Sequence, residues 1–336
     1  MKKKSFKLIL AMLVVVLVVV LTACAAKDTA SDPSNPDEPV IATLVGGSPN
    51  GTWFMVSTGV SECVNRSYPG SVVTIVTGSG LGNITRINAG EVDTGLAYNI
   101  MLNTAAKGEK PFEEKLTNLS TIAKLFPSYL QIVVKKDLGV TSLDEIIKNK
   151  MKVRLSIDQP GSNASQTFLR LIAAYGVTEK DFEDWGGQLV QKSMEESSTM
   201  LSDGLIDGFA IGTLYPVSAI QEAAVNKDLV LLQISSEVRD TMIETYGYQA
   251  AVIPADAYTF TVQETPTIAG NTVLAIPTDA SDELAYKLTK SLVENLDYFR
   301  QIHVMLADLT PETMAKDTGA PLHPGAVKYY EEVGAL

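Results

Sequence analysis

Polar side chains gather in four glycine-containing stretches of this 336-residue chain, and each stretch directly follows a short apolar run. They are residues 48–52, 78–83, 161–165 and 212–216. Each apolar run is typical of a buried strand, and a helix-like run follows each stretch. A helix that begins in such a turn leaves backbone N–H groups without an intrahelical partner. These residue types therefore favour the binding of a small polar molecule, above all one that carries a carboxylate.

The order of strands and helices indicates where these turns lie. From residue 41 onward, apolar strands alternate with helical runs, which predicts an α/β fold with mainly parallel sheets. In such sheets ligands lie beyond the carboxyl ends of the strands. The first two turns belong to one half of the fold and the last two to the other. We therefore expect two lobes around a central ligand cleft, with ordinary β–α turns that bind nothing as the alternative.

Residues suited to enzyme chemistry are sparse. Both histidines, His303 and His323, lie near the C-terminus and belong to no His-x-x-Glu-His or His-x-Glu pattern. The sequence contains no CxxC, Walker A or Gly-x-Ser-x-Gly motif, and the glycines at 78–82 lack the dinucleotide-binding spacing. We therefore expect no metal, no cofactor and no catalytic residue. His323 is expected to cap or pack against the C-terminal helix.

One enzyme alternative stays open. A secreted hydrolase could use a nucleophilic serine in a glycine turn, such as Ser79 or Ser162, although the chain offers neither of them a candidate base. The neighbouring carboxylates Glu195 and Glu196 fall in a helical run and are expected to face solvent.

The N-terminal residues predict export. Residues 1–7 are basic, residues 8–21 are almost entirely apolar, and Leu-Thr-Ala-Cys follows at 21–24. This pattern is typical of a signal peptide over residues 1–23, because the apolar run is shorter than the roughly 20 residues of a membrane span. The Leu-Thr-Ala-Cys ending resembles the lipobox of bacterial lipoproteins, which implies a lipid on Cys24. Residues 24–39 are rich in Pro, Ser and Asp and predict a flexible tether.

Charge and cysteine content limit the partners. The chain has 27 basic and 39 acidic residues and a net charge of −12. Because phosphate neutralisation needs clustered Lys and Arg, this balance argues against nucleic acid as a partner. The two cysteines are Cys24 and Cys63. With Cys24 lipidated, Cys63 has no disulfide partner, and we expect it to be a small core residue.

The chain resembles the TAXI group of solute receptors, the substrate-binding subunits of TRAP transporters, from about residue 41 to residue 334. The matching pieces are GGS at 46–48, GTWF at 51–54, TGS at 77–79 with Asn83, AGEVD at 89–93, YLQIVV at 129–134, PGS at 160–162, LSDGLIDGF at 201–209, LTK at 288–290 with ENL at 294–296, and LHPGAVKYY at 322–330. The chain departs from the family where Trp53 and Phe54 replace two tyrosines, and where Asn163 and Ala164 replace Gly-Thr.

The resemblance implies a two-lobed, periplasmic-binding-protein-like body of type II that closes on its ligand. Lobe one would comprise residues 40–130 and 270–336, and lobe two residues 131–269, with hinge segments at 129–134 and 267–276. The loaded receptor would lie outside the cytoplasm, anchored by lipid to the membrane and facing the periplasm or the cell surface. It would dock on an ion-gradient-driven TRAP permease. The alternatives are a receptor for an ABC importer and a sensory or adhesive lipoprotein.

Ligands of the family are small carboxylates such as glutamate and other dicarboxylates, held without one dedicated arginine. In agreement, Arg86, Arg154 and Arg170 lie outside the glycine turns. We expect the site to be formed by Ser48, Asn50, Thr52 and Ser79 of lobe one, by Ser162, Asn163 and Thr213 of lobe two, and by the aromatic walls Trp53, Tyr98, Phe126 and Tyr215. For each serine or threonine helix capping is the alternative, and for each aromatic residue core packing is.

Overall fold

The computed structural model describes residues 38–49 and 51–336, and the folded body extends from Pro39 to Leu336. The predicted signal peptide, residues 24–37 of the expected tether with the lipidation site Cys24, and the expected ligand residue Asn50 therefore lie outside the described residues.

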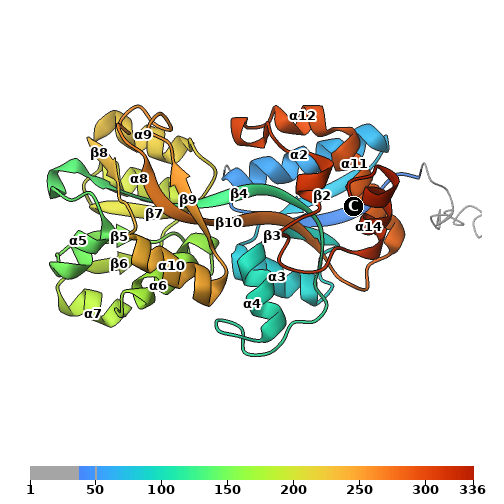
Figure 1. The fold of residues 1–336 in the computed structure, drawn as a ribbon. Helices are drawn as coiled ribbons and strands as arrows, with labels where there is room; N and C mark the ends of the chain where they lie inside the picture. The colour runs from blue at the N-terminus through green and yellow to red at the C-terminus, as the bar shows by residue number, and fades with distance from the viewer. Residues whose placement is uncertain (1–37, 50) are drawn as a thin grey trace, which may run out of the picture. The chain divides into compact units, whose positions relative to one another are not determined.

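The body is an α/β fold built on a mixed, ten-stranded sheet (Figure 1). The strand order is β2-β1-β3-β10-β4-β7-β5-β6, with β8 also paired to β4 and β9 to β10. The strands are β1 (Ile41–Val45), β2 (Val72–Val76), β3 (Thr94–Tyr98), β4 (Ser120–Lys135), β5 (Arg154–Ser156), β6 (Gln188–Val190), β7 (Gly208–Thr213), β8 (Leu229–Leu231), β9 (Gln249–Ile253) and β10 (Thr265–Ile276).

The expected α/β class is confirmed, whereas the sheet is mixed rather than mainly parallel. Strand β1 runs parallel to β2 and β3, and β5 runs parallel to β6 and β7. The long strands β4 and β10 run antiparallel to each other and to their other neighbours. The reason is that helical crossovers link only the outer strands, while β4 and β10 cross the middle of the sheet in opposite directions.

Strands β4 and β10 join the two halves of the body (Figure 1). β3 pairs with residues 272–275 of β10, whereas β7 pairs with residues 129–134 of β4 and β9 with residues 265–269 of β10. We call the half around β1–β3 lobe one (residues 40–130 and 270–336) and the half around β5–β7 lobe two (residues 131–269).

Helices cover the sheet in both lobes. Lobe one contains α2 (Thr52–Ser67), α3 (Gly80–Asn88), α4 (Asn99–Lys107), α11 (Asp282–Glu294), α12 (Leu296–Arg300), α13 (Pro311–Met314) and α14 (Pro324–Glu332). Lobe two contains α5 (Leu143–Lys148), α6 (Asn163–Ala174), α7 (Glu179–Asp184), α8 (Met194–Ser202), α9 (Ser218–Asn226) and α10 (Ser236–Tyr246). Short 3₁₀ turns cover Lys136–Leu138 and Val304–Leu306. Among the described residues, no helix combines the length and the apolar character needed to span a bilayer.

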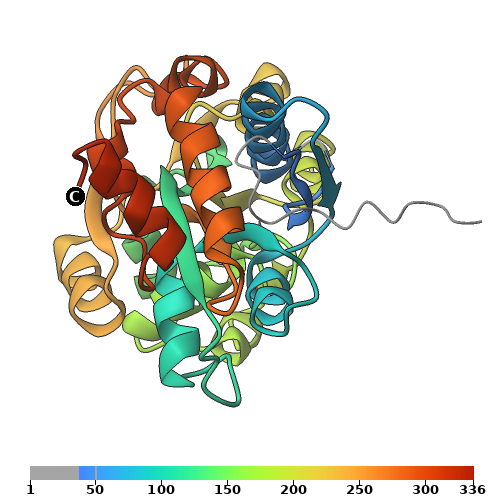
Figure 2. The same ribbon diagram turned by 90° about the vertical axis from the view of Figure 1, so that its right-hand side faces the viewer.

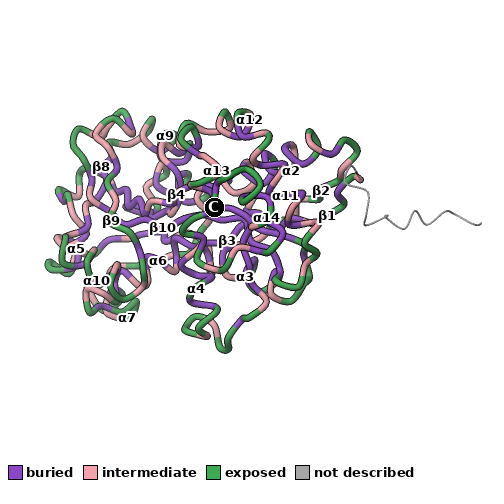
Figure 3. The backbone as a smooth tube through the Cα atoms, turned by 45° about the vertical axis from the view of Figure 1, so that its right-hand side comes forward, coloured by how far each residue is buried: buried purple, intermediate pink, exposed green. Residues whose placement is uncertain are grey.

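Apolar residues of the strands and helices form the core, so that buried strands lie beneath partly exposed helices (Figure 3). In lobe one α11 packs against both α2 and α14, and Figure 2 shows α14, the red helix at the C-terminus, beside α11. Cys63 of α2 is fully buried there, as expected, and its burial raises the pKa of the thiol to about 12. His323 caps α14, also as expected, because its Nδ1 accepts the Gly325 N–H at 3.2 Å.

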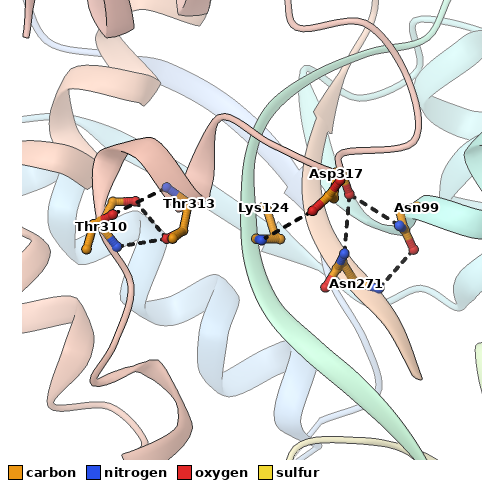
Figure 4. A network of polar contacts seen from close by, with 6 residues as sticks. All are labelled: Asn99, Lys124, Asn271, Thr310, Thr313 and Asp317. Carbon is orange, nitrogen blue, oxygen red and sulfur yellow. Dashed lines mark hydrogen bonds and ion pairs between the residues drawn. The ribbon is translucent and has the colours of Figure 1, made fainter. Parts of the chain in front are cut away.

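A loop near the C-terminus is bound to the long strands through Asp317 (Figure 4). The Asp317 carbonyl accepts hydrogen bonds from Asn99 Nδ2 at 3.2 Å and from Asn271 Nδ2 at 3.3 Å. The Asp317 carboxylate lies 3.9 Å from Lys124 Nζ. Because Lys124 belongs to β4 and Asn271 to β10, this loop fixes both strands on the side of lobe one.

Candidate ligand-binding site

A cavity of about 90 Å³, partly open to solvent, lies between residues of the two lobes. Lobe one contributes Gly47, Ser48, Gly51, Thr52, Trp53, Gly78, Ser79 and Gly80 to the wall, and lobe two contributes Asp158, Gln159, Ser162, Asn163, Ala164, Met194, Ile211, Gly212 and Thr213.

All four glycine-containing stretches singled out in the sequence contribute to this wall. The turns after β1 and β2 approach from lobe one, and those after β5 and β7 approach from lobe two. Since each pair of strands belongs to a parallel group, their carboxyl ends face the same way. The expectation of a central cleft between strand ends is confirmed.

Helices α2, α3, α6 and α8 all begin at or next to this cavity. The residues before α2 and α3, Gly51 and Ser79, make no side-chain capping bond. The first N–H groups of α2 and that of Gly80 in α3 therefore remain available to an acceptor in the cavity, whereas the Leu81 N–H of α3 donates to Gly161 O. Ser162 does cap its helix, because its Oγ accepts the Ser165 N–H at 3.1 Å. The side chain of Ser162 thus both lines the wall and serves the structural role that the sequence left open.

Two buried polar atoms on the wall lack a partner. Asn163 is 7% exposed and Thr213 is 6% exposed. Asn163 Oδ1 and Thr213 Oγ1 are buried without any hydrogen bond within the described chain. Leaving such an atom unsatisfied costs about 1–3 kcal/mol, so a folded protein normally provides it with a partner. These two polar atoms are therefore available to hydrogen-bond with a molecule in the cavity.

Asp158 is a wall residue that the sequence reasoning did not select. It stands at the end of β5 with φ +66°, a left-handed conformation that aspartate tolerates better than most residues. Its Oδ1 accepts the Gln159 N–H at 2.8 Å. Burial raises the pKa of the carboxyl to about 6, and the neighbouring charge of Glu195 contributes to the increase, while hydrogen bonds from Gln159 and Ser162 act against it. The signal was present in the sequence, as an acidic residue that opens the turn after a buried strand.

Glu195 was expected to face solvent, but its side chain is only partly exposed. Its Oε1 is buried without a hydrogen bond among the described residues, and a Cβ placed on Gly51 of lobe one would lie 3.8 Å from it. Its neighbour Met194 lines the cavity. Glu196 behaves as expected: it is exposed, and its Oε2 accepts the Ser193 N–H at 3.1 Å as part of a capping box for α8.

The expected site residues divide into two groups. Ser48, Thr52, Trp53, Ser79, Ser162, Asn163 and Thr213 line the cavity. The indole N–H of Trp53 already donates to Thr272 Oγ1 at 3.2 Å.

The aromatic residues Tyr98, Phe126 and Tyr215 do not line the cavity, which corrects their expected role as walls. Tyr98 ends β3 and is buried, with its ring centroid 6.3 Å from that of Tyr248. Phe126 lies in the middle of β4 and points into the core of lobe one. The ring of Tyr215 packs edge-on against Tyr129, with centroids 4.8 Å apart. Each of these rings is held by packing that the sequence pattern does not specify.

The lobes touch directly beside the cavity. Leu81 N–H of lobe one donates to Gly161 O of lobe two at 2.9 Å. Gly80 lies so close to lobe two that a Cβ there would come within 2.6 Å of Asn163 Oδ1. Farther away, Arg170 Nη2 donates to Thr104 Oγ1 at 3.0 Å, and His303 Nε2 lies 3.2 Å from Pro216 O. The structure therefore has its lobes in a closed arrangement.

The charge on the described wall of the cavity is negative. Within the described part of the chain, Asp158 is the charged residue on the wall, and neither lysine nor arginine lines it. Residues 38–49 and 51–336 also lack any cluster of three or more His, Cys, Asp or Glu side chains that could hold a metal ion.

Comparisons with known proteins agree with this geometry. The sequence profile described as the NMT1-like family matches residues 41–334. The solved structure of the periplasmic binding protein BugD has a TM-score of 0.57 and 16% identity, covering 89% of this chain and 98% of that chain. MatC from Rhodopseudomonas palustris with bound malate also has a TM-score of 0.57 and 16% identity, covering 89% and 99%. At this identity the likeness shows the fold, which is that of periplasmic binding proteins. The chain shares its family and fold with substrate-binding proteins rather than with enzymes.

Proposed function

The chain belongs to the NMT1-like family, and on that basis we propose that it is an extracytoplasmic receptor that captures a small solute in the cavity between its lobes. The observation that carries this proposal is the pair of unpartnered buried atoms, Asn163 Oδ1 and Thr213 Oγ1, on the wall of that cavity. Uncapped helix ends supply N–H donors opposite them. Together these groups offer donors and acceptors to a polar solute in the cavity.

The solute carries a carboxylate, as in glutamate or a dicarboxylate. Two features support this choice: α2 and α3 both begin at the wall without a side-chain cap, and helix N-termini favour negative charge. The site holds the carboxylate by backbone N–H groups and hydroxyls, since arginine is not among the described lining residues. Two residues of the wall in lobe one carry hydroxyl groups near the start of α2: Ser48, which precedes the helix, and Thr52, its first residue.

Delivery follows capture. The loaded receptor docks on the membrane subunits of a TRAP permease and releases its solute there, while a lipid on Cys24 keeps the receptor at the membrane. Support for this part comes from the residues shared with the TAXI group and from the lipobox-like residues 21–24. Metabolic labelling with a clickable fatty acid would test the lipid, with Cys24→Ala expected to lose the label.

A thermal-shift screen of amino acids, dicarboxylates and oxo-acids tests the receptor function. Stabilisation by a ligand at a thousandfold excess over its Kd amounts to about 4 kcal/mol. Thr213→Val should reduce that stabilisation by about 0.5–1.5 kcal/mol without lowering the stability of the free protein, because the hydroxyl it removes has no partner in the described chain.

Thr94→Val is the matched control for this substitution. Thr94 is also a buried strand threonine, but its Oγ1 donates to Ala275 O at 2.7 Å. Thr94→Val should therefore lower the stability of the free protein and leave the ligand shift intact. A full ligand shift in Thr213→Val would place the site elsewhere.

A further inference from the structure

The turn after β7 carries one of the two unpartnered atoms of the wall. β7 ends at Thr213, whose Oγ1 is buried there without a hydrogen-bond partner in the described chain. The turn continues through residues 214–217 to α9, which begins at Ser218. A hydroxyl binds a solute well only if its backbone is held in place, because hydrogen bonds weaken steeply as their geometry departs from linear. The contacts that hold this turn therefore bear on how Thr213 can act.

Gln131 holds the turn from strand β4. Its side chain is buried, and its Nε2 donates to Leu214 O at 2.9 Å and to Thr213 O at 3.4 Å. The backbone pairing of β4 with β7 ends at the pair of Tyr129 and Thr213. The amide of Gln131 therefore adds a side-chain bond beyond the last paired residue of β7, where the chain leaves the sheet.

Tyr258 fixes the orientation of that amide. It is buried, and its hydroxyl oxygen accepts the Val217 N–H at 3.2 Å. The hydroxyl donates its own hydrogen to Gln131 Oε1. Because the amide oxygen faces Tyr258, the amide must present its N–H groups to the carbonyls of the turn. Tyr258 and Gln131 thus hold the turn at both ends, at Thr213 and Leu214 and again at Val217.

Lobe one contacts the same turn from the other side. Leu214 belongs to the buried apolar cluster that contains Phe126 of lobe one, and His303 Nε2 lies 3.2 Å from Pro216 O. Apolar side chains would fill the space behind the turn without needing partners, whereas a buried amide and a buried phenol need each of theirs in place. The Gln131–Tyr258 pair therefore gives the turn a defined position that apolar packing alone does not specify.

We propose that Gln131 and Tyr258 are positioning residues of the solute site, which fix the turn after β7 so that the Thr213 hydroxyl meets a solute in the cavity. Neither residue is part of the described wall, so their effect on binding passes through the turn. The assignment rests on the proposed receptor function and deepens it, because it names residues behind the wall that set the affinity. The largest effect it allows is the loss of the hydrogen bond from Thr213, which is about two- to tenfold in affinity.

Calorimetric titration of the full-length receptor tests the assignment, with the tightest binder among L-glutamate, glutarate and succinate as the probe. Tyr258→Phe removes the hydroxyl, and Gln131→Met keeps the length of the side chain but removes its polar contacts. Each should weaken binding of the probe by about two- to tenfold. Tyr258→Phe is the milder change and decides the matter if Gln131→Met does not fold.

Tyr330→Phe is the matched control for Tyr258→Phe. Tyr330 of α14 is also buried, and its hydroxyl also donates to β4, to Ile122 O at 3.2 Å. Tyr330 is not part of the described wall and contacts no residue of the turn through a hydrogen bond in the described chain. Tyr330→Phe should therefore lower the stability of the free protein in urea and leave the affinity for the probe unchanged.

Combination with Thr213→Val distinguishes positioning from simple stabilisation of the fold. Once the Thr213 hydroxyl is absent, Tyr258→Phe and Gln131→Met should have no further effect on affinity, although each still lowers the stability of the free protein. If both leave the affinity unchanged, or weaken it equally with and without Thr213→Val, the assignment is wrong and the receptor function stands. A wild-type receptor that binds none of the three probes overturns both.

Discussion

At the scale of single residues, the site depends on polar atoms that the fold buries and leaves unpaired. Other buried polar side chains do have a partner: the Ser156 hydroxyl, for example, accepts a hydrogen bond from the Ser197 hydroxyl at 2.7 Å. Thr213 Oγ1 and Asn163 Oδ1 have none in the described chain. Holding such atoms unpaired reduces stability, and a bound solute restores it. The same reasoning applies to Asp158, because burial of its carboxyl disfavours the ionised form.

Asp158 should make the solute-free protein lose stability as pH rises from about 4 to about 7. Its folded-state pKa of about 6 lies above the usual 3.8, so the folded state holds a proton that the unfolded state has already released. Stability then falls with pH across that window, by up to about 3 kcal/mol. Asp158→Asn removes the titrating carboxyl and with it this pH dependence of stability. Urea unfolding at several pH values should show the two proteins diverging above pH 4, with the variant the more stable; parallel curves would contradict this account.

The sequence predicted the turns better than the individual side chains. Glycine, serine and threonine at strand ends are local signals, and the stretches around Ser48, Ser79, Ser162 and Thr213 do reach one cavity. Of the four aromatic residues expected in the wall, Trp53 lines the cavity and Tyr98, Phe126 and Tyr215 do not, because aromatic character does not say whether a ring packs in the core. Glu195 was missed because its burial depends on Gly51, which approaches from the other lobe.

At the scale of elements, charged and buried polar side chains connect the strands of lobe two. Asp207 precedes β7 and accepts hydrogen bonds from Arg154 of β5, while Lys135 at the end of β4 lies 2.9 Å from its carboxylate. Burial by itself would raise the pKa of Asp207, but the bonds from Arg154 and Lys135 outweigh it and hold the pKa well below its usual range. The carboxylate of Asp207 thus links the three neighbouring strands β4, β7 and β5.

Asp207→Asn should lower the free energy of unfolding by about 2 kcal/mol at neutral pH. Because the folded-state pKa is depressed, the contribution of Asp207 is present above about pH 4 and is lost as pH falls below that value. The difference between wild type and variant should therefore shrink in acid. Asp184→Asn, which removes an exposed pair with Lys180 on α7, should change stability by no more than about 0.5 kcal/mol. Equal effects of the two substitutions in chemical denaturation would refute the role given to Asp207.

The mixed sheet marks the limit of sequence reasoning at this scale. The hinge segments expected at 129–134 and 267–276 do lie in β4 and β10, but β4 already begins at Ser120. Which strands become neighbours is set by contacts far apart in the chain, such as Asn271 of β10 opposite Pro127 of β4. No local pattern encodes that pairing, so the antiparallel centre could not be predicted.

At the scale of the whole folded body, the cavity depends on how closely the lobes approach. Leu81 N–H and Gly161 O form a direct backbone bond between them. Gly80 permits this approach, since any side chain at that position would meet Gly161 O at 3.0 Å as well as Asn163. A ligand drives closure only through its higher affinity for the closed form. A side chain at residue 80 would therefore hinder closure and lower the affinity for the solute.

Gly80→Ala should weaken solute binding by about tenfold or more while leaving the free protein folded. The added methyl group would prevent the closed arrangement rather than disturb either core. Gly82→Ala is the matched control on the same helix, because its nearest contact would be Ser79 Oγ at an ordinary 3.5 Å. Titration calorimetry gives the affinities, and small-angle scattering with and without solute reports closure. Equal affinity in both variants would show that this contact does not limit closure.

The position of β10 has a consequence for how the chain is made. In the finished sheet this strand lies between β3 and β4, yet it comes near the end of the sequence, after all of lobe two. Until the ribosome has synthesised residue 276, the two earlier strands have no neighbour on that side. Lobe one therefore stays incomplete through most of translation. A nascent polypeptide that cannot finish folding early stays unfolded for longer, which would suit the export that the N-terminal residues predict.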